Sequence, residues 1–191
     1  MSMKKNLIKG MTELGEMLFT HFGITGPLVL SASSFMSTEL SNYRIELDLK
    51  PALDKETLRN RIKREIAEMG PEEFFAELVR RLVPKPLVVP ICKEIDVHSR
   101  LYISKVTDKE FERLIKVLKG WSFPISDYAS FDYAIVTAGG VKCSEVNEYT
   151  MESKLVKGLY FAGEVLDVDG VTGGFNLQAA WSTAKAVSMS I

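Results

Sequence analysis

The residues best suited to binding chemistry lie near the carboxyl end, in the stretch GEVLDVDGVTGGFN over residues 163–176. Gly173 and Gly174 remove side chains and permit unusual backbone angles, so backbone N–H groups could come close to a ligand. A helix beginning at about Asn176 would be capped by that side chain and would add free N–H donors and a partial positive charge. The pattern predicts a binding site for an electron-rich or anionic group at the start of this helix.

Acidic side chains occupy the same turn, at Glu164, Asp167 and Asp169. Carboxylates are poor neighbours for phosphate, but they accept hydrogen bonds from sugar hydroxyls. The turn is therefore typical of a polyol-bearing cofactor whose electron-rich end meets the helix. A tight strand-to-helix turn with solvated acids fits the same residues equally well, because short glycine motifs often occur without a ligand.

Other binding chemistries fail on spacing. DVDG resembles the start of a calcium loop, but counting from Asp167 the positions 5, 6 and 12 hold valine, threonine and glutamine. The sequence has no G-x-G-x-x-G, no phosphate-loop lysine motif and no G-x-S-x-G elbow. His21 and His98 have no partners at metal-ligand spacing, so no metal site is predicted.

The bulk composition excludes several classes of protein. The chain has 191 residues, 46% of them hydrophobic, and a formal net charge of −1, so it can build a core and has no overall field for nucleic acid or acidic membranes. No apolar run approaches the roughly 18 residues of a membrane span, and the first residues lack the apolar block of a signal peptide. We therefore expect a cytoplasmic protein in which Cys92 and Cys143 are inert thiols.

The first third of the chain predicts strands and a short helix. GEMLFTHFGITGP, residues 15–27, is typical of a strand and a glycine-bracketed turn, with Pro27 at the first position of a helix. His21 in this stretch could donate a proton to a bound substrate, although a structural hydrogen bond is the more common role. Apolar and charged residues alternate over residues 43–50, which indicates a half-buried antiparallel strand.

A helical block follows over about residues 54–119. Asp54 is a predicted helix cap, Thr107 and Glu110 form a predicted capping box, and Gly120 is predicted to end the last helix. Pro90 limits the helix around it to a short or kinked form.

Basic residues in this block raise the alternative of a nucleic-acid-binding or other non-catalytic interaction module. Between Lys50 and Glu94 there are 10 basic and 8 acidic side chains, which leaves +2. Such a balance is typical of a solvated surface rather than a phosphate-binding stripe. Nucleic-acid binding is therefore the less favoured hypothesis.

Beyond Gly120 the character changes to that of a parallel sheet. FDYAIVTAGGV, residues 131–141, is predicted to end in a strand before two glycines, and residues 159–162 are predicted to form a second apolar strand. Ligands of open α/β sheets lie beyond the carboxyl ends of such strands, where Gly163 and Glu164 stand. The predicted fold class is α+β / α/β, with a mixed strand and helical domain over 1–120 and an α/β segment over 121–191.

These stretches resemble a known family. GEMLFTHFGITGP and VTAGGVKCSEVNEYTMESKLVKGLYFAGEVLDVDGVTGGFNLQAAWS are similar to bacterial FAD-dependent flavoproteins, described as NAD(FAD)-utilising dehydrogenases or aminoacetone-oxidase-like FAD-binding enzymes. Some relatives reduce steroid-type enones in bile-acid metabolism. The likeness runs through nearly the whole chain, with the two quoted stretches most specific and the helical block loosely matched.

The resemblance implies a Rossmann-type FAD domain interrupted by an insert domain that is part β-barrel and part helical. Residues 1–120 then correspond to most of the insert domain, and 121–191 to the C-terminal segment that returns to a partial Rossmann fold. This sequence has no counterpart of the first FAD-binding half, which carries the G-x-G-x-x-G motif. We therefore expect that half to be a partner of this chain that the sequence lacks. Strand edges left without neighbours would also favour self-association.

The resemblance also implies which residues would hold FAD. Glu164 would bond a ribityl hydroxyl with Asp167 beside it, and the last helix would face the pyrimidine edge of the flavin, where its dipole would stabilise the reduced anion. His21, Thr25 and Gly26 would lie toward the substrate. The implied cofactor-binding residues are Gly139, Gly140, Gly163, Glu164, Asp167, Thr172, Gly173, Gly174, Phe175 and Asn176.

The implied activity is hydride transfer between a nicotinamide, NAD(P)H, and a small organic substrate through FAD. This chain as a separate molecule is expected to bind FAD weakly or not at all and to be inactive, because half of the cofactor contacts are absent. The non-catalytic interaction module is the alternative.

Overall fold

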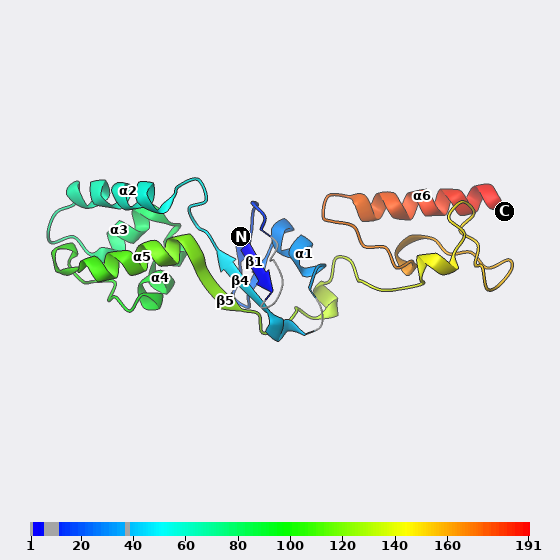
Figure 1. Cartoon of the computed structure of the whole chain (residues 1–191), viewed down its shortest axis with the longest axis horizontal. Helices are drawn as coiled ribbons and strands as arrows, with labels where there is room; N and C mark the ends of the chain where they lie inside the picture. Colours follow the sequence, from blue (N-terminus) through cyan, green and yellow to red (C-terminus); the bar gives the residue numbers. More distant parts are fainter. Residues whose placement is uncertain (1, 6–11, 37–38) are drawn as a thin grey trace. The chain divides into compact units, whose positions relative to one another are not determined.

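The structure is a computed structural model of the chain, and it describes residues 2–5, 12–36 and 39–191. Helices and small sheets occur together, which confirms a mixed α and β fold class (Figure 1). The chain divides into two compact units, each made of two separate stretches of sequence. Unit 1 comprises Met1–Leu14 and Ser41–Ile125, and unit 2 comprises Gly15–Leu40 and Ser126–Ile191.

Unit 1 contains a three-stranded antiparallel sheet in the order β1–β4–β5. Its strands are β1 (Ser2–Lys5), β4 (Tyr43–Leu47) and β5 (Trp121–Pro124). In β4, Tyr43, Ile45 and Leu47 are buried while Arg44 is exposed, so the predicted half-buried antiparallel strand is confirmed. The Arg44 guanidinium donates across the sheet to the Ser122 hydroxyl at 3.2 Å.

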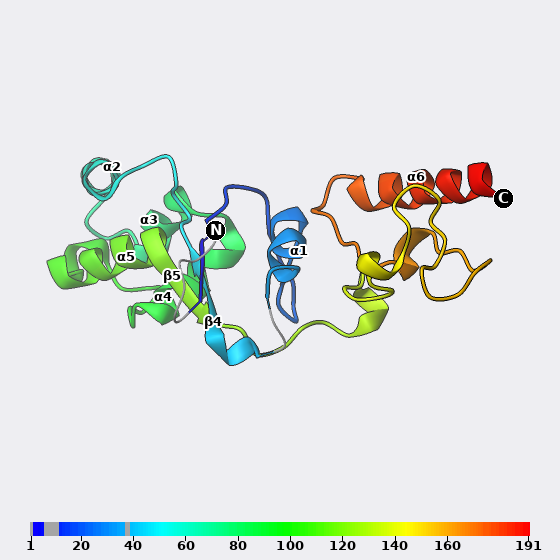
Figure 2. The same ribbon diagram turned by 45° about the vertical axis from the view of Figure 1, so that its right-hand side comes forward.

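Helices α2 to α5 lie together beside β4 and β5 in both views (Figures 1 and 2). They are α2 (Lys55–Ala67), α3 (Phe75–Leu82), α4 (Val88–Glu94) and α5 (Asp108–Gly120). The predicted starts are confirmed, because the Asp54 carboxylate accepts from the Thr57 N–H at 2.7 Å and Thr107 forms a capping box with Glu110. Pro90 lies within the seven-residue helix α4, which confirms a short helix there.

The core of unit 1 lies where these helices meet one another and the sheet. Because their apolar stripes face inward, the largest fully buried side chains come from β4, α2, α3, α4 and α5. They are Leu47, Leu58, Phe75, Leu78, Val79, Leu82, Ile91, Leu114 and Leu118. This unit therefore has a packed apolar interior.

Arginines on the outside of the helical block are paired with carboxylates. The pairs are Arg59–Glu112 at 2.8 Å, Arg61–Glu65 at 3.7 Å, Arg80–Glu77 at 3.1 Å and Arg81–Glu65 at 3.3 Å. Such pairs are typical of a solvated helix surface, and each contributes little to stability.

Unit 2 begins with a small hairpin and a helix. The strands β2 (Leu18–Phe19) and β3 (Ile24–Thr25) pair around a turn in which the Thr20 hydroxyl accepts from the Gly23 N–H at 3.1 Å. The predicted single strand and turn is thus a two-stranded hairpin. Pro27 opens α1 (Pro27–Ser33) as predicted, because a proline at the first helical position loses no hydrogen bond.

The rest of unit 2 consists of loops, isolated bridges and the last helix, α6 (Phe175–Ser190). The two predicted strands of this region are wrong for this structure. Residues 131–133 form a 3-10 turn with no strand after it, and Tyr160 makes only an isolated bridge with Glu152. A β-branched apolar run forms a strand only where it has a neighbour to pair with, and pairing is not encoded in the run itself.

Candidate cofactor site

Two loops of unit 2 meet at the glycine pair of the sequence VTAGGV. The Val141 N–H donates to the Val165 carbonyl at 2.8 Å, and the Asp167 N–H donates to the Val141 carbonyl at 2.9 Å. This is a parallel bridge between Val141 and Leu166. It brings Gly139 and Gly140 next to the acidic turn, although they lie over twenty residues earlier in the chain.

Gly140 is required by this contact. Its φ is +141°, and a Cβ at this position would lie 2.5 Å from the Val165 carbonyl oxygen and 2.9 Å from the Leu166 carbonyl carbon. Gly139 also has a positive φ, +98°, but a Cβ there would meet nothing within 4 Å. Close packing against the backbone therefore explains why position 140 requires glycine. Gly139 instead borders open space.

Glu164 is held by the loop that precedes the glycine pair. Its Oε1 accepts from the Thr137 N–H at 3.0 Å and from the Thr137 hydroxyl at 3.3 Å. The neighbouring Gly163 has φ +80°, and its N–H donates to the Thr183 hydroxyl on α6 at 3.0 Å. Glu164 is therefore anchored between the loop and the helix.

Asn176 does not cap the last helix, so that prediction is wrong. The helix begins one residue earlier, at Phe175, and its N-cap is Gly174 in a left-handed conformation with φ 88°. Asn176 lies inside the first turn, where its Oδ1 accepts from the Gly170 N–H at 2.7 Å and its Nδ2 donates to the Gly170 carbonyl at 2.9 Å. Its side chain closes the loop before the helix.

The start of α6 can bind an electron-rich group. The Gln178 N–H is the first to bond within the helix, to the Gly174 carbonyl at 3.0 Å. The N–H groups of Phe175, Asn176 and Leu177 have no acceptor among the described residues, and Gly174 supplies no side chain to cap them. These donors carry the partial positive charge of the helix end.

The other implied cofactor residues surround this turn. Asp167 is exposed, and its backbone takes part in the parallel bridge. Thr172 is exposed, and a Cβ on Gly173 would lie 3.3 Å from the ring of Phe175. The ten implied cofactor residues thus lie in two stretches of unit 2, one at or next to the parallel bridge and one at the start of α6.

The implied substrate-side residues lie on the hairpin and at the start of α1. His21 is exposed in the hairpin turn, with its ring 4.9 Å from that of Phe22 in an edge-on arrangement. Thr25 belongs to β3, and the carbonyl of Gly26 accepts the first hydrogen bonds of α1. Within the described residues no hydrogen bond joins His21, Thr25 or Gly26 to the two cofactor-side groups.

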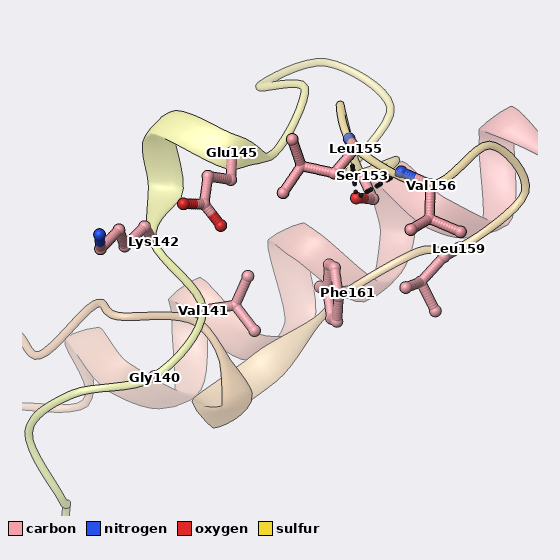
Figure 3. Close-up of a pocket in the computed structure, with 9 residues that line it drawn as sticks. All are labelled: Gly140, Val141, Lys142, Glu145, Ser153, Leu155, Val156, Leu159 and Phe161. Atoms are coloured by element: carbon pink, nitrogen blue, oxygen red, sulfur yellow. Dashed lines mark hydrogen bonds between the residues drawn. The ribbon is translucent and has the colours of Figure 1, made fainter.

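A hollow of about 360 Å³ borders the parallel bridge (Figure 3). Part of its wall is a loop over residues 153–161, in which the Ser153 hydroxyl accepts from the N–H groups of Leu155 and Val156 at 3.1 and 3.2 Å. Its lining is mainly apolar, with two charged side chains at one end. The lining residues are Gly140, Val141, Lys142, Glu145, Ser153, Leu155, Val156, Leu159 and Phe161.

Sequence reasoning missed three residues that shape the site. Thr137 and Thr183 bind Glu164 and Gly163 from distant positions, and nothing local in the sequence marks these pairs. Gly170 was visible only as part of a D-G turn, and the asparagine that binds it lies six residues later. An asparagine that follows a glycine turn, such as Asn176, predicts a side chain that bonds the loop backbone as readily as it predicts a helix cap.

Within the described part of the chain, no three or more His, Cys, Asp or Glu side chains gather in a way that could hold a metal ion. We also find no helix among these residues with the length and apolar character needed to cross a bilayer.

A glycine turn that opens a helix can present free backbone N–H groups to a bound ligand. Over residues 9–190 the chain matches the family described as the HI0933-like protein Rossmann domain, and it belongs to that family. This membership supports the resemblance to FAD-type flavoproteins at the level of the family.

Three curated relatives are similar to nearly the whole chain. The ribosomal RNA dihydrouridine synthase of Haemophilus influenzae is 36% identical over 95% of the chain. The 3-dehydro-bile acid delta(4,6)-reductase of Clostridium scindens is 32% identical over 90%, and the ribosomal RNA dihydrouridine synthase of Escherichia coli is 33% identical over 92%. The chain spans 42–43% of the length of these relatives.

Proposed function

We propose that this chain forms the flavin-ring side of an FAD site in an oxidoreductase that reduces a carbon–carbon double bond conjugated to a carbonyl group. The observation that carries the proposal is the start of α6, where three backbone N–H groups lack acceptors among the described residues. The pyrimidine edge of a flavin is electron-rich and becomes anionic on reduction, so it matches these donors. Family membership supports the same cofactor class.

The residues around the turn fit the rest of the flavin in chemical type. Glu164 and Asp167 offer carboxylate oxygens for ribityl hydroxyls, and Gly139 and Gly174 border open space where a ring could approach the backbone. Bound FAD, recharged by NAD(P)H, would supply the hydride for the reduction. The chain's own residues would bind the ring, orient it and stabilise its negative charge.

The substrate class follows from the names of the relatives. A dihydrouridine synthase saturates the C5–C6 bond of uracil, and a delta(4,6)-reductase acts on double bonds conjugated with the 3-keto group of its bile acid. In both cases the bond reduced is activated by a carbonyl, so hydride addition at one carbon requires a proton at the other. His21, exposed at the hairpin turn, is the candidate to hold that proton.

A second polypeptide segment belongs to the proposal, because the chain spans less than half of its relatives. We assign to it the pyrophosphate and adenosine contacts and the missing strand partners of residues 131–137 and 159–162. One face of α6 supports this, since Leu177 and Trp181 are 61% and 66% exposed. Such an apolar face calls for a covering partner. A second copy of this chain is the alternative occupant.

The interaction-module hypothesis gains no support from unit 1. Its arginines Arg59, Arg61, Arg80 and Arg81 pair with carboxylates, so the charge of these four side chains is locally balanced. If this protein contacts RNA, we propose that it does so because RNA is its substrate, as the names of two relatives indicate. The charge of the helical block is not the basis for that proposal.

Titration of the purified chain with FMN and, separately, with ADP tests the proposal, with the amide NMR signals as the readout. These probes carry the two halves of FAD. We expect FMN at near-millimolar concentration to shift the signals of residues 139–141 and 163–177, and ADP to leave them unchanged. Shifts caused by ADP instead, or no response to FMN, would refute the assignment. Stoichiometric FAD on the purified chain would refute the need for a second segment.

A further inference from the structure

The loop before α6 is closed by a single side chain. Asn176 exchanges two hydrogen bonds with the backbone of Gly170, one donated by the Gly170 N–H at 2.7 Å and one accepted by its carbonyl at 2.9 Å. A Cβ on Gly170 would lie 3.2 Å from the Cβ of Phe175, so the loop is also tightly packed against the first helical residue. The amide group thus joins the two ends of the turn that carries Gly173 and Gly174.

These bonds commit the amide to the loop. An asparagine at this place could have capped the helix or contacted a ligand directly, but its carbonyl and amino groups both point to Gly170. The helix is instead preceded by Gly174, whose φ of +88° is a conformation that a side chain would strain. The first N–H groups of α6 stay uncapped as a result.

We propose that Asn176 is a positioning residue: it fixes the turn over residues 170–175 so that the first N–H groups of α6 remain open to the pyrimidine edge of a flavin. This rests on the function proposed above, and it assigns to Asn176 an action through the backbone rather than contact with the cofactor. The side chain holds the donors in place before the ligand arrives, which reduces the ordering that binding requires.

The test compares two amide-to-acid substitutions in the same helical turn. Asn176→Asp keeps the acceptor for the Gly170 N–H but replaces the amino donor with an oxygen that faces the Gly170 carbonyl. Gln178→Glu makes the same change of charge two residues later, where the amide donates to the Ser182 hydroxyl at 3.1 Å. Both acids lie in the first turn of the helix, where a negative charge is favourable, so a loss specific to Asn176→Asp reports on the loop.

Binding of FMN to the whole chain is the first readout. We expect affinity to fall at least ~10-fold in Asn176→Asp and in Asn176→Ala, and to change less than ~3-fold in Gln178→Glu. Equal effects of the two acids would show that charge alone is responsible and would overturn the proposal. Unchanged affinity in Asn176→Ala would overturn it as well.

Hydrogen exchange at the Gly170 amide is the second readout, and it needs no ligand. We expect protection to be lost in Asn176→Ala and retained in Asn176→Asp, because only the aspartate keeps an acceptor. Protection of the Gly170 amide that persists in Asn176→Ala would show that the Asn176 side chain does not close the loop. If the wild-type chain binds no FMN while the Asn176→Ala variant still loses protection at Gly170, the flavin assignment is refuted. The closure of the loop by Asn176 is then still established, so the two failures are distinguishable.

Discussion

Gly140 shows at the residue scale how the site is built from backbone contacts. The left-handed glycine lies against the backbone of residues 165–167, and the bridge at Val141 depends on that approach. If ligand binding were the reason for both glycines, Gly139 and Gly140 would have similar surroundings. Only Gly140 is packed against the backbone of the chain.

Gly140→Ala is expected to destabilise unit 2 by about 2–4 kcal/mol, because it combines an unfavourable φ with a 2.5 Å approach to the Val165 oxygen. Gly139→Ala, with a positive φ of +98° but open space around it, should cost about 1 kcal/mol. Urea denaturation followed through the amide signals of residues 141–167 measures both. Equal costs would mean that the close approach has no energetic weight.

The helix caps of unit 1 predict a dependence of stability on pH. Hydrogen bonds from the Thr57 backbone N–H and hydroxyl lower the pKa of Asp54, and those from Thr107 lower the pKa of Glu110. A carboxyl whose pKa is lower in the folded state stabilises the fold above its unfolded pKa of about 4, and that stability is lost as the pH falls through the folded pKa. The urea midpoint should therefore drop below about pH 4.

Asp54→Ser is the matched control for this effect. Serine keeps a capping oxygen but does not titrate, so its curve of urea midpoint against pH should be flatter than that of the wild type. Parallel curves would show that the Asp54 cap does not contribute to the acid sensitivity.

At the scale of elements, α6 differs from the helices of unit 1. It has no buried residue, whereas α5 buries Leu114 and Leu118 completely. Asn176, Ala180 and Thr183 contact the loops at Gly170 and Gly163, whereas Leu177 and Trp181 are exposed.

Ser substitutions at Leu177 and Trp181 should each change the free energy of unfolding by less than about 0.5 kcal/mol, because these side chains already face solvent. Leu114→Ala, at a fully buried position, should cost about 2–5 kcal/mol. Urea denaturation checks the contrast. Sedimentation velocity on the same variants should show less self-association in the serine double variant, and unchanged association would exclude this face as the contact between copies.

The sequence was informative for several elements that are specified locally, although the local prediction of an Asn176 cap was wrong. The Asp54 cap, the box at Thr107 and Glu110, Pro27 at a helix start and the alternation in β4 are all properties of adjacent residues, and all four are confirmed. The strand expected before Gly139 was wrong because a strand needs a neighbour. For the same reason the bond between Thr137 and Glu164, 27 residues apart, could not be read from either residue.

At the scale of the whole molecule, apolar burial is distributed unevenly between the units. Among the described residues, those of unit 2 with buried hydrophobic side chains are Leu28, Ala32, Leu40, Val146 and Leu166, while all other buried hydrophobic side chains belong to unit 1. A small buried core implies low local stability.

Hydrogen exchange over the whole chain should therefore protect α3, α4 and α5 most strongly and residues 126–191 least. Addition of a segment that completes the FAD domain should raise protection in α6 and in residues 131–137 and 159–162, since new strand pairing would engage their amides. Protection of these stretches in the free chain equal to that of α5 would show that they need no partner.

The discontinuous make-up of the two units sets an order on events during synthesis. Gly15–Leu40 is made before Ser41–Ile125, and the rest of its unit starts only at Ser126. At typical translation rates of about 5–20 residues per second, those residues take roughly 4–17 s to appear. During that interval the hairpin that carries the exposed Phe19 and Phe22 has no completed unit to join.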